Sequence, residues 1–446
     1  MGGRRAIRRL QHAAPETDLV QDMTIEGQGL ASSDGKRVFI DGAIGGETVT
    51  FRRVRAHRDY DEAELLAIDR PAPQRVAPRC QYFGTCGGCS LQHLSPAAQL
   101  ALKERTLVES LKRIAAVVPD RLMPAVTGPA WGYRRRARLG ARYVAGKGRV
   151  LVGFSERHGS WITDMRSCET LHPALATLLS PLGDLIGSLA IRQRIPQVEV
   201  AVADNATVLV FRVLEPPGPA DLAALRAFRQ QHGLRVLLQG GGPDSLQPLD
   251  AEVDGGELWY GIAGTGLRMG FGPTDFIQVN GAINDSMVGL ALELLAPAAG
   301  MRLLDLYCGI GNFTLPLAQR AGTVLGVEGA APMIERARDN ARRNGIGNAA
   351  FALADLSTAD GAVPWAGQRF DAVLLDPPRA GAAAIIDPLV QTRARHILYV
   401  SCHTGTLARD AATLVHGHGY RLAATGILDM FPSTSHVESM ALFERP

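Results

Sequence analysis

The chain has 446 residues, of which 46% are hydrophobic and 20% are charged, and its formal net charge is +3. This length exceeds one ordinary hydrophobic core, so roughly two or three domains are expected. No stretch approaches the roughly 18 uninterrupted apolar residues of a membrane span. The basic N-terminus MGGRRAIRRL has no apolar segment behind it, which argues against a secretory signal. We therefore expect a cytoplasmic protein without a membrane partner.

The N-terminal part divides into a basic arm, residues 1–17, and a segment of short alternating runs, residues 18–74. The runs DMTIEGQGLA and RVFIDGAIGGETVTFRRV alternate apolar and polar residues between glycine turns. Period-two alternation of this kind predicts a small β-barrel. The proline-rich PAPQRVAP that follows is typical of a linker.

Three cysteines lie close together in the loop CQYFGTCGGCS, with the spacing C-x5-C-x2-C, and RSCETLHP supplies a candidate fourth ligand. Close cysteine spacing in a cytoplasmic chain indicates metal binding or catalysis rather than disulfides. Four thiolates suit either zinc or a 4Fe–4S cluster, and the spacing leaves both open. The predicted ligands are Cys80, Cys86, Cys89 and Cys168.

Residues 75–268 mix strand-like runs such as QVEVAVADNATVLVFRV with the helix-like PADLAALRAFRQQHG, which predicts a central α+β domain. Within it a helix is predicted over residues 96–117, because Ser95 can cap it and Pro96 suits its first position. We expect this helix to pack on the C-terminal domain through an apolar stripe of Leu100, Leu107, Leu111 and Ile114.

Basic residues form three local clusters, and the largest lies between Trp131 and Arg149, where there is no acid. Its members, with the interleaved aromatics, are Trp131, Tyr133, Arg134, Arg135, Arg136, Arg138, Arg142, Tyr143, Lys147 and Arg149. The other two comprise Arg4, Arg5, Arg8 and Arg9, and Arg52, Arg53, Arg55 and Arg58. Such clusters attract phosphates, and aromatics can stack on bases. One cluster alone is compatible with a solvated surface, but three favour a polyanionic partner.

Residues 269–446 show repeated strand–helix units. Apolar runs typical of buried strands alternate with alanine-rich helical stretches, and these runs are RLLDLYC, TVLGVE, AAFALAD, FDAVLLDPP and HILYVSC. This alternation predicts an α/β domain with a parallel sheet covered on both faces. The tail after them is expected to form two strands joined by a long turn.

The first of these strands leads into a glycine-rich loop, LLDLYCGIGNFTLPLA, and the next strand ends in Glu328. A glycine turn followed by an acid at the end of a second strand can hold a nucleoside ribose. Thr314 stands where a dinucleotide-binding loop has its third glycine, which argues against a nicotinamide oxidoreductase. Together with Asp355 and Asp376 at later strand ends, the loop predicts an S-adenosylmethionine site.

Asp376 lies in LLDPPRAG, where Arg379 replaces the base-stacking aromatic of amino-group methyltransferases. One strand later, Cys402 lies at the carboxyl edge of the sheet and directly before a helix, a position that favours a thiolate. Methylation at C5 of uracil needs such a thiolate, which adds at C6, and then a base for the C5 proton. Glu438 in SHVESM is the candidate base. A buried structural cysteine is the alternative for Cys402 alone, but the neighbouring motifs disfavour it.

The runs LDLYCGIGNF, LLDPPRAG, YVSCHTGTLARD and HVESMALF together resemble the RNA uracil-C5 methyltransferase family. The N-terminal barrel resembles an OB-like TRAM domain, and CQYFGTCGGC resembles the cluster loop of that family. The overall pattern is most similar to the bacterial 23S rRNA 5-methyluridine enzymes.

The resemblance implies a class I Rossmann-like methyltransferase domain in which Cys402 is the nucleophile and Glu438 the proton acceptor. It favours a 4Fe–4S cluster over zinc and implies an RNA partner, 23S rRNA, bound by a monomer. His403-Thr404-Gly405 departs from the Asn-Pro-Ala common in relatives, which leaves the target position open. The implied donor contacts are Gln278, Tyr307, Asn312, Glu328, Asp355 and Asp376.

The sequence therefore predicts S-adenosylmethionine-dependent methylation of uracil C5 in RNA. A tRNA uracil-C5 or a cytosine-C5 methyltransferase on the same scaffold remains an alternative. An alternative of another class is a non-catalytic RNA-binding protein with a vestigial donor site, against which the presence of both Cys402 and Glu438 argues.

Overall fold

The computed structural model describes residues 8–9, 13–358 and 363–445. The chain divides into two compact units. The first comprises Met1–Lys103, Glu156–Gly159 and Pro432–Ser435, and the second comprises Glu104–Ser155, Ser160–Phe431 and His436–Pro446. Of the N-terminal basic cluster, Arg4 and Arg5 lie outside the described residues, whereas Arg8–Arg9 forms a short strand.

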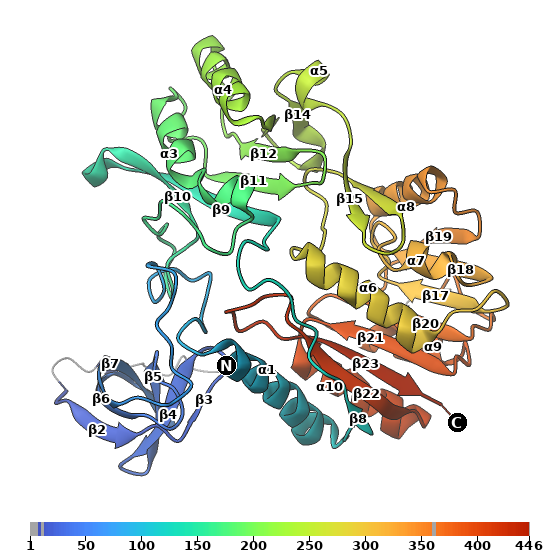
Figure 1. Ribbon diagram of the computed structural model, residues 1–446, viewed down its shortest axis with the longest axis horizontal. Helices are drawn as coiled ribbons and strands as arrows, with labels where there is room; N and C mark the ends of the chain where they lie inside the picture. Colours follow the sequence, from blue (N-terminus) through green and yellow to red (C-terminus); the bar gives the residue numbers. More distant parts are fainter. Residues whose placement is uncertain (1–7, 10–12, 359–362, 446) are drawn as a thin grey trace, which may run out of the picture. The chain divides into compact units, whose positions relative to one another are not determined.

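The first unit contains a seven-stranded, strongly curved sheet (Figure 1) with the order β1-β6-β7-β5-β4-β3, in which β2 also pairs with β6. Its core includes alternate residues of its strands, such as Val38 and Ile40 of β5 and Phe51 of β6, together with Val20 between β2 and β3, and all four are fully buried. An N-terminal barrel-like β-domain is thereby confirmed. The strands are β1 (Arg8–Arg9), β2 (Glu16–Leu19), β3 (Asp22–Met23), β4 (Gln28–Ser33), β5 (Lys36–Asp41), β6 (Thr48–Ala56) and β7 (Tyr60–Arg70).

The helix expected at 96–117 consists of α1 (Pro96–Ser110) and a π-helical turn, η1 (Leu111–Ala115). The predicted stripe is wrong at its end, because Ile114 is 57% exposed whereas Ala115 is buried. A π-helical turn contains more residues than an α-turn, so it rotates the residues that follow away from the α-helical stripe.

A mixed six-stranded sheet in the second unit has the order β10-β9-β11-β12-β13-β14. Only β12 and β13 pair in parallel, and α4 connects them. The predicted α+β character of this region is confirmed. Its elements are β9 (Arg136–Val144), β10 (Arg149–Gly153), α2 (Pro173–Ala176), α3 (Leu179–Ser188), β11 (Gln197–Val202), β12 (Thr207–Arg212), α4 (Pro219–His232), β13 (Arg235–Gln239), β14 (Leu246–Pro248) and α5 (Ala251–Asp254).

A hairpin of β15 (Leu258–Ile262) and β16 (Leu267–Phe271) precedes the main sheet of the second unit. That sheet has eight strands in the order β19-β18-β17-β20-β21-β23-β22-β8. The strands are β8 (Arg121–Leu122), β17 (Arg302–Leu306), β18 (Thr323–Glu328), β19 (Ala349–Leu353), β20 (Ala372–Leu375), β21 (His396–Ser401), β22 (Arg421–Leu428) and β23 (Glu438–Glu444).

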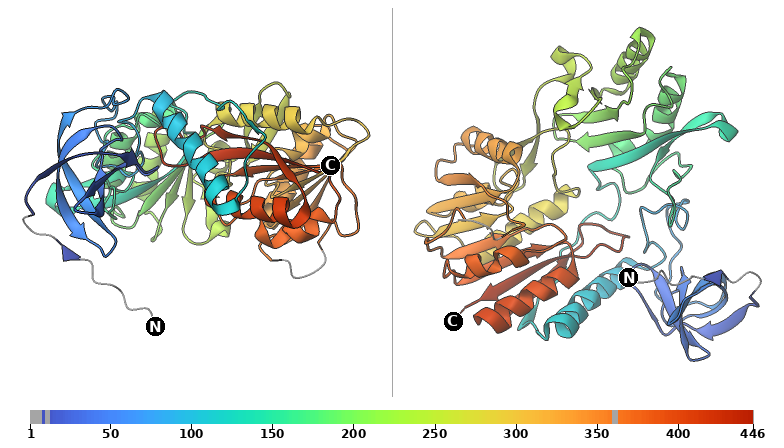
Figure 2. Two further views of the ribbon diagram at one scale, coloured as in Figure 1. Left: turned by 90° about the horizontal axis from the view of Figure 1, so that it is seen from below. Right: turned by 180° about the vertical axis from the view of Figure 1, so that it is seen from behind.

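The five strands from β19 to β21 pair in parallel, whereas β23 is antiparallel to both of its neighbours. Helices cover both faces, with α6 and α10 packed on β21 from opposite sides (Figure 2). This arrangement confirms the class I Rossmann-like domain. The helices are α6 (Gly281–Leu295), α7 (Thr314–Ala318), α8 (Ala331–Arg343), α9 (Ile386–Val390) and α10 (Thr404–Ala412).

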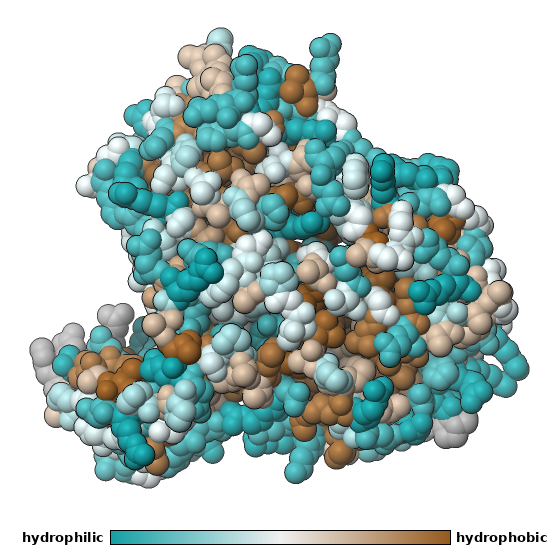
Figure 3. All heavy atoms as spheres, viewed as in Figure 1, coloured by the Kyte–Doolittle hydropathy of each residue, from teal (hydrophilic) through white to brown (hydrophobic). Residues whose placement is uncertain are grey.

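Within the described ranges, no helix has the length and apolar character needed to cross a bilayer. On the face drawn in Figure 3, hydrophilic side chains are interspersed with hydrophobic ones.

Candidate active site

Three neighbouring strands, β20, β21 and β23, bring the predicted catalytic residues to one edge of the main sheet. In the parallel part, Leu375 at the end of β20 pairs with Tyr399 of β21, so Asp376 lies beside the end of β21. In the antiparallel part, Ser401 pairs with Ser439. One further step of that register sets Cys402 opposite Glu438, the first residue of β23. The sheet order therefore groups residues that are up to 62 positions apart in sequence.

The position of Cys402 is fixed by the turn between β21 and α10. The Ser401 hydroxyl donates to the carbonyl of His403 at 3.1 Å. His403 is the N-cap of α10, and its Nδ1 accepts the N–H of Thr406 at 3.2 Å. A histidine that departs from the family pattern thus performs the capping that asparagine commonly performs.

The surroundings of Cys402 oppose ionisation of its thiol. Burial, followed by the carboxylates of Glu438 and Asp376, raises the pKa of Cys402 to about 11. The expectation that a helix N-terminus favours the thiolate is therefore wrong for this site: desolvation and two nearby carboxylates outweigh the helix dipole.

The glycine-rich loop after β17 has the tight geometry that a bound nucleoside requires. Gly309 and Gly311 have φ of +53° and +91°, in the left-handed region that glycine adopts without strain. The N–H of Gly309 donates to Oε2 of Glu328 at 3.1 Å. The other oxygen of Glu328 accepts the N–H groups of Gly329 and Ala330 at 2.8 and 3.1 Å. Glu328 therefore connects the glycine turn to the start of α8.

Asn312, at the end of the same loop, is held by two residues that the sequence did not single out. Its Oδ1 accepts hydrogen bonds from the Tyr260 hydroxyl at 3.0 Å and from Nδ2 of Asn284 at 3.1 Å. Its Nδ2 donates back to Asn284 at 2.9 Å. No local pattern marks Tyr260 or Asn284, because their partner lies 52 and 28 positions away.

The remaining predicted donor contacts follow the ends of strands, except Gln278, which precedes α6. The Tyr307 hydroxyl donates to the carbonyl of Leu356 at 3.0 Å. Asp355 is exposed, and hydrogen bonds from Ser357 lower its pKa. Burial raises the pKa of Asp376 to about 7. Gln278 is partly exposed on the segment before α6.

The cysteines predicted to hold a metal cluster belong to different parts of the chain. Cys86 is buried, and Cys80 and Cys89 are partly buried, in the loop that precedes α1. Cys168, also buried, lies between β10 and α2. Among the described residues, no three His, Cys, Asp or Glu side chains form a group suited to one metal ion. The cluster therefore stays a prediction.

Most of the clustered arginines are paired with acids from other elements. Glu199 on β11 pairs with both Arg136 and Arg138, at 3.3 and 3.1 Å. Asp164 pairs in the same way with Lys147 and Arg149, at 2.6 and 2.7 Å. Further pairs are Arg135 with Asp204, Arg53 with Glu16 and Asp61, and Arg55 with Glu62.

Arg142 differs from these neighbours. It is exposed on β9, forms no ion pair with any described residue, and its guanidinium lies 4.8 Å from the ring centre of Trp161. Trp161 is itself 60% exposed. Of the aromatics that the sequence drew attention to, Tyr133 is buried and Tyr143 lies under Arg192.

Comparison with known proteins gives concordant matches. A family model described as tRNA (Uracil-5-)-methyltransferase matches residues 259–446. The 23S rRNA (uracil(1939)-C(5))-methyltransferase RlmD of Thiobacillus denitrificans is 50% identical over 421 residues, covering 94% of this chain and 97% of that protein. The protein of that name from Methylococcus capsulatus is 48% identical over 443 residues, covering 99% and 100%.

Among solved structures, the tRNA (uracil-54, C5)-methyltransferase of Pyrococcus abyssi in complex with S-adenosyl-L-homocysteine matches with a TM-score of 0.74. It is 23% identical to this chain, and the match covers 96% of this chain and 100% of that one. At this identity the likeness supports the fold.

Proposed function

The chain belongs to the RNA uracil-C5 methyltransferase family, and from this premise we propose that it methylates C5 of a uracil in 23S rRNA, with S-adenosylmethionine as the methyl donor. The observation that carries the proposal is the pairing of Ser401 with Ser439, which sets Cys402 opposite Glu438 at the sheet edge that also carries the glycine-rich loop. The enzyme is proposed to act as a monomer in the cytoplasm.

The reaction needs two groups because C5 of uracil is a weak nucleophile. The sulfur of Cys402 adds to C6, and the electron pair of the C5–C6 double bond becomes available at C5. C5 then takes the methyl group as its bond to the donor sulfonium breaks. Glu438 removes the C5 proton, the double bond re-forms, and the thiolate of Cys402 leaves C6. The products are 5-methyluridine and S-adenosylhomocysteine.

The donor is proposed to lie against the glycine-rich loop. Glu328 fits the role of a ribose acceptor, since its Oε2 accepts one backbone N–H, that of Gly309, and has a second lone pair for a ribose hydroxyl. The full set of proposed donor contacts is Gln278, Tyr307, Asn312, Glu328, Asp355 and Asp376.

Two substitutions test the catalytic assignment on a 23S rRNA transcript, with a tRNA transcript as the comparison substrate. Cys402→Ala is expected to abolish methyl transfer while binding S-adenosylhomocysteine with wild-type affinity. Glu438→Gln is expected to accumulate a covalent protein–RNA adduct that survives heating and migrates slowly in a denaturing gel. Retained turnover in Cys402→Ala contradicts the nucleophile. Preferential methylation of the tRNA transcript contradicts the proposed substrate.

We further propose that Cys80, Cys86, Cys89 and Cys168 bind a 4Fe–4S cluster. The support is chemical, because four thiolates and no other ligand type are a donor set that this cluster uses. The reaction needs no electron transfer, so the cluster is assigned a structural or RNA-facing role. Protein purified without air is expected to contain about four iron and four sulfide per chain. Zinc in place of iron contradicts the cluster.

The RNA is proposed to pass over β9, where Arg142 and Trp161 are exposed together. An unpaired guanidinium can contact a phosphate, and an exposed indole can stack on an unpaired base. The paired basic residues around them contribute less, since Glu199 and Asp164 each offset part of the charge of two of them.

A further inference from the structure

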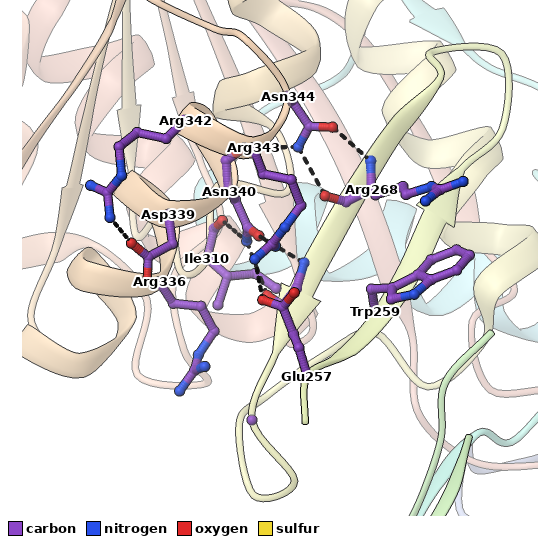
Figure 4. A network of polar contacts seen from close by, with 12 residues as sticks. Glu257, Trp259, Arg268, Ile310, Arg336, Asp339, Asn340, Arg342, Arg343 and Asn344 are labelled. Atoms are coloured by element: carbon purple, nitrogen blue, oxygen red, sulfur yellow. Dashed lines mark hydrogen bonds and ion pairs between the residues drawn. The ribbon is translucent and has the colours of Figure 1, made fainter. Parts of the chain in front are cut away.

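The outer edge of β16 is paired with the side chains of a helix instead of another strand (Figure 4). Oδ1 of Asn344 accepts the N–H of Arg268 at 2.9 Å, and its Nδ2 donates to the carbonyl of Arg268 at 2.8 Å. Asn340 repeats the pattern on Gly270, with distances of 2.7 and 3.0 Å. Asn340 of α8 and Asn344, the C-cap of that helix, are four residues apart and match residues two apart on a strand, because both spacings are about 6 Å.

Asn340 makes one contact that Asn344 does not. Its Nδ2 also donates to the carbonyl of Ile310 at 3.1 Å. Ile310 lies between Gly309 and Gly311, the two left-handed glycines of the donor loop. Asn340 is fully buried, so its amide lies where water cannot replace a lost partner.

The donor loop is therefore held from two sides. Glu328 accepts its N–H at Gly309, and Asn340 donates to its carbonyl at Ile310. Arg343 stabilises the amide of Asn340 by donating to Oδ1 at 2.9 Å, and it pairs with Glu257, the residue before β15. Nδ2 of Asn340 faces the carbonyls of Gly270 and Ile310, and these two acceptors determine which end of the amide is the NH₂ group.

From these contacts we propose that Asn340 is a positioning residue for the methyl donor, acting through the carbonyl of Ile310. The proposal rests on the proposed function, in which this loop binds S-adenosylmethionine. Asn340 holds the glycine turn in its binding geometry before the donor arrives, so that donor binding does not have to order the loop. Loss of this hydrogen bond should weaken donor binding and raise the KM for the donor, while kcat and the KM for RNA change little.

The chain supplies a matched control in Asn344. Asn340→Asp removes the donor group that faces the carbonyls of Gly270 and Ile310, and Asn344→Asp removes the one that faces the carbonyls of Arg268 and Asn340. Both variants loosen the contact between α8 and β16, but only the first reaches the donor loop. A purely structural role predicts the same change in donor affinity for both.

The test is calorimetric titration of each variant with S-adenosylhomocysteine, together with thermal melting and steady-state kinetics. Asn340→Asp is expected to weaken binding about tenfold, the cost of leaving a buried polar group unsatisfied, and Asn344→Asp to stay within about twofold. Asn340→Ser, which removes the amide without adding charge, replaces Asn340→Asp if that variant does not fold. Wild-type affinity in the Asn340 variant, or equal losses in both, overturns the proposal. Wild-type protein that binds S-adenosylhomocysteine without methylating RNA contradicts the proposed function instead.

Discussion

At Cys402 the two halves of the reaction make opposite demands. Addition to C6 needs a thiolate, whereas removal of the C5 proton needs a carboxylate within reach of the same uracil. Glu438 is only 5% exposed, and among the nearby charges its carboxylate does most, after burial, to raise the pKa of Cys402. The carboxylate of Glu438, which completes the reaction, therefore disfavours its first step, the addition of the Cys402 thiolate. A smaller fraction of Cys402 is ionised because its proton acceptor lies close to it.

This conflict predicts a pH dependence that one substitution shifts. Below a pKa of about 11, the thiolate fraction of Cys402 rises about tenfold per pH unit, so its alkylation by iodoacetamide should accelerate from pH 7 upward. Glu438→Gln removes a negative charge, which lowers the pKa of Cys402 and moves the profile to lower pH. The rate is followed by mass spectrometry of the peptide that contains Cys402.

Glu444→Gln is the matched control, since Glu444 lies at the far end of the same strand, β23. It should leave the alkylation profile unchanged. Superimposed profiles for wild type and Glu438→Gln would show that Glu438 does not act on the thiol.

At the scale of elements, local sequence patterns predicted the strands well, but they predicted the buried face of the helix at residues 96–115 less well. TVLGVE coincides with β18, because a strand buried on both faces is a continuous apolar run in the sequence. Ile114 was misplaced because the π-helical turn depends on contacts from far along the chain. There Ser110 donates to Thr404 at 3.1 Å, and a ring nitrogen of His416 lies 2.8 Å from the carbonyl of Ala115.

In the candidate site, too, some residues could be predicted from local sequence and others could not. Cys402 and Glu438 could be singled out from the sequence, because each lies in a recognisable run. Cys402 follows a parallel strand, and Glu438 begins the antiparallel strand beside it. Tyr260 and Asn340 were not, because each acts through a loop residue 52 or 30 positions away, Asn312 or Ile310. Their roles depend on the tertiary fold, and no periodicity or spacing encodes them.

Over the whole molecule, 47 basic and 44 acidic residues nearly balance, and the fold pairs many of them across elements. A count of arginines along the chain therefore overstates the charge available to RNA. Asp61 and Glu62 on β7 form ion pairs with Arg53 and Arg55 on the neighbouring β6, although residues 52–58 themselves contain no acid. Affinity for RNA should then depend on the few exposed cations that lack such partners.

Arg142 and Trp161 make this expectation measurable. Trp161→Ala should weaken binding of a 23S rRNA fragment by about tenfold, the usual range for loss of one stacked base, and Trp161→Phe should restore most of it. Arg142→Gln should lower the dependence of log affinity on log salt by about one. Arg149→Gln, whose arginine is paired with Asp164 at 2.7 Å, should change that slope much less.

The binding of S-adenosylhomocysteine should be unaltered in all of these variants, because no side-chain hydrogen bond or ion pair joins β9 to residues 307–313 within the described ranges. Equal changes in slope for Arg142→Gln and Arg149→Gln would contradict the idea that ion pairing decides which arginines contact RNA. An undiminished affinity in Trp161→Ala would remove the stacking assignment while leaving the catalytic one intact. The two results together separate electrostatic attraction, which responds to salt, from stacking, which does not.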